Sequence, residues 1–176
     1  LSLRLGYSCT MPVTVLVSIS AVLALVPAAV LPYRGGQSRD ALFWMLLGVG
    51  LIGAVLTVGL LFAPGWRTGI GSALWATLAV TLALFAIVAA LSTEAWRLAA
   101  LMLPYLILIG TIATIWQDSP ERILATGSLG VWTAAHIVVA LLAYGFLTIG
   151  AVAGAGAYVQ ERALKAKRPT RLSRLL

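Results

Sequence analysis

The amino-acid sequence predicts an all-α protein, a polytopic transmembrane helical bundle with about five spans. Of its 176 residues, 61% are hydrophobic and only 10% are charged, and the mean hydropathy is +1.04. Soluble domains carry about 25% charged residues, so a polar surface cannot cover a soluble core of this size. The apolar residues form long runs without the period-two alternation of strands, which favours helices.

Five apolar runs are long enough to cross a bilayer, which takes about 20 residues. They cover residues 12–31, 41–63, 70–91, 98–116 and 131–158. The links between them are short, so consecutive helices are expected to be antiparallel neighbours. Residues 12–168 then form one transmembrane domain. We expect residues 1–11 to be an upstream extension and residues 169–176 a basic cytoplasmic linker, truncated in a fragment that lacks C-terminal spans.

Proline marks the start or interior of several runs and the end of the last helix. The first run starts at Pro12 and contains Pro27, and the fourth contains Pro104. Neighbouring helices satisfy the backbone groups that such prolines free. The fifth run continues into a basic segment, where Glu161 and Lys165 have the i,i+4 spacing of a surface ion pair. Pro169 is expected to end that helix.

The distribution of basic residues predicts an N-out, C-in orientation. With the C-terminus in the cytoplasm, the outer side holds only Arg4, Arg67 and Arg122, and the inner side holds the other nine basic residues. Cytoplasmic loops carry the excess of Lys and Arg, so this orientation is strongly favoured. The net charge of +7 therefore indicates topology rather than nucleic-acid binding. The predicted location is a bacterial inner membrane.

Several function classes lack the residues that they need. One cysteine, Cys9, excludes an internal disulfide framework and a multi-cysteine metal site. No acidic residue lies in the middle of a span, which weakens the prediction of an ion-coupled transporter. A catalytic dyad and a phosphate-binding loop are also missing from the sequence, so the chain is not predicted to be an enzyme.

His136, the only histidine, lies in the fifth run. At 100° per residue, a stripe of residues falls within about 40° of it, and most of them are small. Gly150 and Gly154 form a GxxxG pair, which permits close helix approach. We therefore expect this stripe to pack inside the bundle, with His136 and Trp132 at its outer mouth. The stripe comprises Trp132, His136, Ala140, Ala143, Leu147, Gly150 and Gly154.

Two interpretations of these side chains remain open. His136 either binds a metal or haem iron through a neutral ring nitrogen, or forms a hydrogen bond across helices and fixes packing. The six tryptophans lie near the two ends of the runs, which is typical of an interfacial aromatic belt. Alternatively, the outer group lines a flat hydrophobic ligand. That group is Trp66, Trp75, Trp116 and Trp132, whereas Trp44 and Trp96 lie near the inner side.

The fifth run resembles the central helix of the cytochrome c assembly membrane proteins, in particular the YpjD or HemX-like branch related to CcsA and CcmC. The resemblance covers about thirty-five residues and includes the motifs VWTAAHI, LLAY and YVQERALK, with Leu103-Pro104-Tyr105 upstream. It implies a protein of about eight spans that acts outside the cytoplasm in c-type cytochrome maturation. By position, His136 matches the family histidine that is a candidate haem iron ligand, and Trp132 is implied as a further haem-binding residue.

Parts of the family pattern are missing. The tryptophan-rich loop of the haem-handling relatives is absent, because residues 117–130 contain no tryptophan. A second axial ligand is not identified, since Met11, Met45 and Met102 are poorly placed. The resemblance still implies haem as cofactor and the lipid bilayer, other cytochrome c maturation components and apocytochrome c as partners. The alternatives are a small-molecule permease subunit and a structural subunit of a membrane complex.

Overall fold

The structure is a computed structural model and describes residues 13–34, 40–92, 94–117, 119, 123–125 and 130–166. Helices make up nearly all of this part of the chain. In order, the elements are α1 (Val13–Val30), the 3-10 helix η1 (Leu31–Arg34), α2 (Ala41–Phe62), β1 (Trp66–Arg67), α3 (Ile70–Leu91), the 3-10 helix η2 (Ala95–Leu98), α4 (Ala99–Ile115), β2 (Ile123–Ala125) and α5 (Val131–Lys165).

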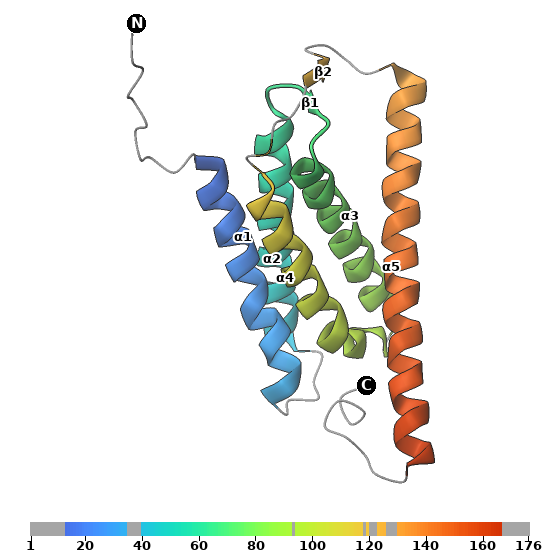
Figure 1. Ribbon diagram of the computed structural model, residues 1–176. Coiled ribbons are helices and arrows are strands. Elements are labelled where there is room, and N and C mark those ends of the chain that lie inside the picture. The colour runs from blue at the N-terminus through green and yellow to red at the C-terminus, as the bar shows by residue number, and fades with distance from the viewer. Residues whose placement is uncertain are drawn as a thin grey trace, which may run out of the picture.

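Helices α1 to α4 form a bundle in which each helix packs against two others. The principal contacts join α1 to α2, α2 to α3, α3 to α4 and α4 back to α1. Helix α5 lies outside this ring, against α3, with only slight contact to α4 (Figure 1). The molecule is thus a four-helix bundle with a fifth helix attached along one side.

The predicted all-α polytopic bundle is confirmed. Five helices in the described residues are long and apolar enough to cross a membrane, and their bounds lie within a few residues of the predicted spans, except at the end of α5. The chain is therefore a membrane protein. Helix α5 has 35 residues and, at 1.5 Å per residue, is about 52 Å long. A hydrocarbon core is about 30 Å thick, so the basic end of α5 extends beyond it.

The core lies between α1, α2, α3 and α4. Its largest fully buried side chains include Trp75, Phe43 and Phe85. Two buried polar side chains in this core meet each other, because the hydroxyl of Ser18 on α1 lies 2.7 Å from Oε1 of Gln117 after α4. This contact avoids the cost of an unpaired polar group in an apolar interior. The interfacial-belt expectation is wrong for Trp75, because this side chain is buried in the core.

The links contain a short ribbon that the sequence did not predict. Strands β1 and β2 pair antiparallel, with Trp66 opposite Ala125 and Arg67 opposite Ile123. Before β1 the chain turns at Gly65, whose φ of 135° suits glycine because it has no Cβ. We call the end of the bundle that carries this ribbon the β end; α5 begins there (Figure 1). Under the predicted orientation, the β end is the outer side.

Helix α5 continues through the basic segment as predicted. It reaches Lys165, and its Nζ lies 2.6 Å from Oε1 of Glu161, which confirms the predicted i,i+4 pair. At this end α5 projects past the other helices (Figure 1). The predicted extension at residues 1–11, the stop at Pro169 and the linker at residues 169–176 lie outside the described residues.

Candidate functional site

One face of α5 packs against the bundle, and we call it the inward face. Its centre is Gly145, where an added Cβ would lie 2.6 Å from Cδ1 of Leu84 and 3.5 Å from Oγ1 of Thr81 on α3. Ile149 and Gly156 are also buried on this face. Glycine at position 145 thus lets α5 approach α3 closely.

The stripe that contains His136 faces away from the bundle, and we call it the outward stripe. Gly145 lies nine residues after His136, which is about 180° around the helix. Trp132 is 89% exposed and Leu147 is 69% exposed. Added Cβ atoms at Gly150 and Gly154 would meet nothing within 4 Å. The expectation that this stripe packs inside the bundle is therefore wrong for the described helices.

Helix α5 carries small residues on more than one face. Small residues in a membrane helix indicate close helix packing, but α5 carries them on two opposite faces. The inward face has Gly145 and Gly156, and the outward stripe has Gly150 and Gly154. The sequence alone does not tell which of these faces meets α3. The structure assigns the inward face to α3 and leaves the outward stripe uncovered by the described helices.

His136 lies in the second turn of α5, near the β end, and its side chain is exposed. In the described part of the chain, no hydrogen bond or ion pair engages its imidazole. Trp132 lies one turn earlier on the same stripe. The structure therefore brings these two exposed side chains to one surface of α5.

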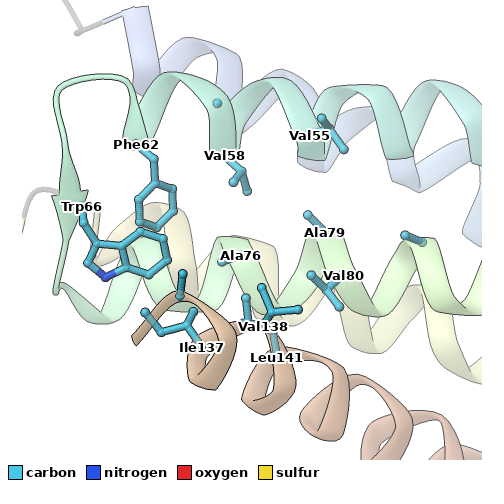
Figure 2. A pocket seen from close by; sticks show the side chains of 13 residues that line it. Val55, Val58, Phe62, Trp66, Ala76, Ala79, Val80, Ile137, Val138 and Leu141 are labelled. Atoms are coloured by element: carbon cyan, nitrogen blue, oxygen red, sulfur yellow. The ribbon is translucent and has the colours of Figure 1, made fainter. Parts of the chain in front are cut away.

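A groove lies on the other side of α5, between α2, α3 and α5, near the β end (Figure 2). Its volume is about 500 Å³. Phe62 and Trp66 close one end, with ring centroids 4.7 Å apart. Thirteen residues line it: Val55, Val58, Gly59, Phe62, Trp66, Ala76, Ala79, Val80, Ala83, Ala134, Ile137, Val138 and Leu141.

The groove can accept an apolar molecule but offers no side chain that binds iron. Its lining is almost entirely hydrocarbon, and the only side-chain nitrogen is that of Trp66. Ile137 points into the groove (Figure 2), whereas the adjacent His136 does not line it. The groove and the imidazole are therefore two separate features of the same part of α5.

The other candidate iron ligands do not gather around His136. Met102 is buried in the core with 1% exposure, and Met45 is exposed in the second turn of α2, near the opposite end of the bundle. Met11 lies outside the described residues. The described residues contain no group of three or more His, Cys, Asp and Glu side chains that could hold a metal ion. Within this part of the chain, His136 is thus an isolated candidate ligand.

The chain is similar to a longer bacterial protein. A protein of Azospirillum brasilense, described as "Uncharacterized 28.8 kDa protein in nifR3-like 5'region", is 42% identical over 164 residues. The match covers 90% of this chain and 60% of the relative, so the chain spans about three-fifths of the relative's length. No family model and no solved structure matches the chain. This description of the relative names no activity, ligand or partner.

Proposed function

We propose that this membrane protein binds or handles haem in c-type cytochrome biogenesis, with His136 as an axial ligand of the haem iron. The proposal includes the predicted orientation, which puts the β end on the extracytoplasmic side of a bacterial inner membrane. Other cytochrome c maturation components and apocytochrome c are the proposed partners. The proposal rests on the resemblance of α5 to the cytochrome c assembly membrane proteins together with the position of His136.

The observation that carries the proposal is the exposure of His136 on a membrane helix. A polar side chain within a bilayer span usually faces a bundle interior, a cavity or a ligand. His136 faces none of the described helices, and no described side chain satisfies its ring nitrogens. A neutral imidazole with an accessible nitrogen is a common axial ligand of haem. An external ligand would therefore give this imidazole the partner that it lacks in the described structure.

The residues beside His136 are compatible with a flat, largely apolar group. Trp132 presents an exposed aromatic ring one turn away on the same stripe. Aromatic rings pack favourably against other flat π-systems in offset or edge-to-face arrangements. When bound, haem supplies an iron centre that accepts a ring nitrogen, and the protein's part is to hold and orient it. His136 would bind the iron and Trp132 would cover part of the ring.

A haem titration of the purified protein tests this proposal. We expect a Soret band to develop on addition of haem to the wild-type chain and to be shifted or lost in His136→Ala. In His136→Gly, free imidazole can enter the vacated space, so its addition is expected to restore the wild-type band. Val139→Ala is the matched control, because Val139 is also exposed on α5 but lies off the outward stripe.

Two results would refute the haem proposal. One is a wild-type chain that gives the same spectrum as haem in empty detergent micelles. The other is a His136→Ala spectrum identical to that of Val139→Ala. The structural-subunit alternative predicts this second result, because it assigns His136 to helix packing alone.

A further inference from the structure

The groove between α2, α3 and α5 opens onto the surface of the bundle that faces the membrane. Val55 on α2 and Val138 on α5 both line it, and they are 55% and 54% exposed. The buried alanines Ala76 and Ala79 of α3 form its floor (Figure 2). Helices α2 and α5 make at most slight contact with each other, so neither closes the groove. Because all three helices are apolar enough to cross a membrane, the groove is continuous with the surface that lipid covers.

The groove lies at the depth of the lipid leaflet on the side of the β end. On α2 it extends from Val55 to Phe62, the last residue of that helix. These residues are seven positions apart, which is about 10 Å at 1.5 Å per residue. A hydrocarbon core is about 30 Å thick, so the groove runs from the β end roughly one third of the way across it. The first part of an acyl chain lies at this depth.

At the level of the groove, α5 packs only loosely against the bundle. None of the residues of α5 before Gly145 is buried, and Ala134, Ile137 and Leu141, which line the groove, are half-buried. Membrane helices associate largely through van der Waals packing, and atoms that line an unfilled space lose such contacts. A molecule in the groove would therefore supply the packing that the described helices do not give to the first part of α5.

The chemistry of the lining suits a hydrocarbon chain. The groove has a volume of about 500 Å³, within the range of about 300–1,000 Å³ that is usual for ligand pockets. The indole nitrogen of Trp66 is the only polar side-chain atom among the lining residues, and Trp66 belongs to the end that is closed by its contact with Phe62. Tryptophan commonly lies where a membrane changes from hydrocarbon to headgroups. The lining thus matches a chain whose polar end lies at the β end.

We propose that the groove binds one acyl chain of a membrane phospholipid from the leaflet at the β end. The ester end of the chain lies near Trp66, and the chain runs along the floor of α3 between Val55 and Val138. It thereby joins α5 to α2, which have little direct contact. This proposal does not rest on the haem proposal, because His136 does not line the groove.

Native mass spectrometry of the detergent-purified 176-residue chain tests this proposal, with dioleoylphosphatidylcholine as the added lipid. The unsubstituted chain is expected to retain one phospholipid. Gly59 on α2 lines the groove, and an added Cβ there would meet nothing within 4 Å. The side chain of Gly59→Leu can therefore occupy the groove without a clash. Because the acyl chain then loses its contacts, we expect the retained fraction to fall at least about tenfold.

The matched control is Gly48→Leu. Gly48 also lies on α2, where an added Cβ would meet nothing within 4 Å, but it does not line the groove. Leucine raises helix propensity at both positions, so a difference between the two variants reports on the groove. Gly48→Leu is expected to retain the lipid as the unsubstituted chain does. Equal retention in the two variants, or no lipid on the unsubstituted chain, would overturn the proposal. A dimer that Gly59→Leu abolishes would overturn it in favour of a second copy.

Amide hydrogen exchange gives a second measurement. Removal of lipid from the unsubstituted chain is expected to speed exchange in residues 131–141 of α5, because that part of the helix loses its packing. Exchange around Gly145, which packs directly on α3, should change little. In Gly59→Leu, lipid should have no effect on residues 131–141. Exchange there that is independent of lipid in the unsubstituted chain would contradict the role of the acyl chain in joining α5 to α2.

Discussion

Both faces of α5 carry glycines, but the glycines of the two faces have different surroundings. On the inward face, Gly145 lies against Leu84 and Thr81 of α3, and an added Cβ would collide with Leu84. On the outward stripe, Gly150 and Gly154 face open space, about four and five turns along the helix from His136. The inward face thus fixes α5 to the bundle. The outward stripe is exposed and can contact a molecule outside the described helices. A small residue in a membrane helix signals close approach without saying which partner approaches.

Substitution of leucine for a glycine on each face should give the largest difference in stability between the two faces. Gly145→Leu places a large side chain against α3, and overpacking of this kind is expected to lower the free energy of unfolding by about 3 kcal/mol. Gly150→Leu projects into open space and should not lower it, and the higher helix propensity of leucine should raise it by up to about 1 kcal/mol. Denaturation of the detergent-solubilised chain measures both values. Equal destabilisation by the two variants would mean that the assigned faces are wrong.

Removal of an aliphatic side chain gives a second, smaller contrast. Ile149 is 9% exposed in the core cluster, whereas Leu147, two residues earlier, is 69% exposed. Ile149→Ala should cost about 2 kcal/mol through lost contacts and the cavity left behind. Leu147→Ala should cost less than about 0.5 kcal/mol in the 176-residue chain. The same denaturation assay applies, and a larger loss for Leu147→Ala would reverse the assignment.

The smallest effect is expected at the basic end of α5. The Glu161–Lys165 pair is highly exposed, with 62% and 76% of the side chains accessible. Exposed pairs of this kind contribute roughly 0–0.5 kcal/mol and are screened by salt. Glu161→Gln should therefore shift stability by less than about 0.5 kcal/mol, and the shift should vanish at high salt. A larger, salt-independent loss would show that Glu161 has a buried role.

The spans could be predicted from the sequence because length and hydropathy decide whether a helix crosses a bilayer. The boundaries of α2 and α3 agree with the predicted runs to within one residue. The short β1–β2 ribbon could not be predicted, since it depends on two links that are distant in sequence. The burial of Trp75 was also missed, because a tryptophan near a span end looks the same in a belt and in a core.

The location of the candidate site was predicted only in part. His136 and Trp132 do share one stripe at the β end, as helical geometry requires. The direction of that stripe was predicted wrongly, because small residues lie on two opposite faces of α5 and the sequence does not tell which of the two faces meets α3. Only the close approach between Gly145 and α3, which depends on the fold of all five helices, decides the direction.

The central claim is that the inward face holds the fold, and that the proposed haem ligand His136 lies on the opposite, outward stripe. The most direct test is a haem titration of His136→Ala beside Ile149→Ala, at a temperature where both variants are folded. The account predicts that His136→Ala loses the wild-type Soret band while Ile149→Ala keeps it, although Ile149→Ala is the less stable protein. An unchanged Soret band in His136→Ala, or an equal loss in both variants, would contradict it.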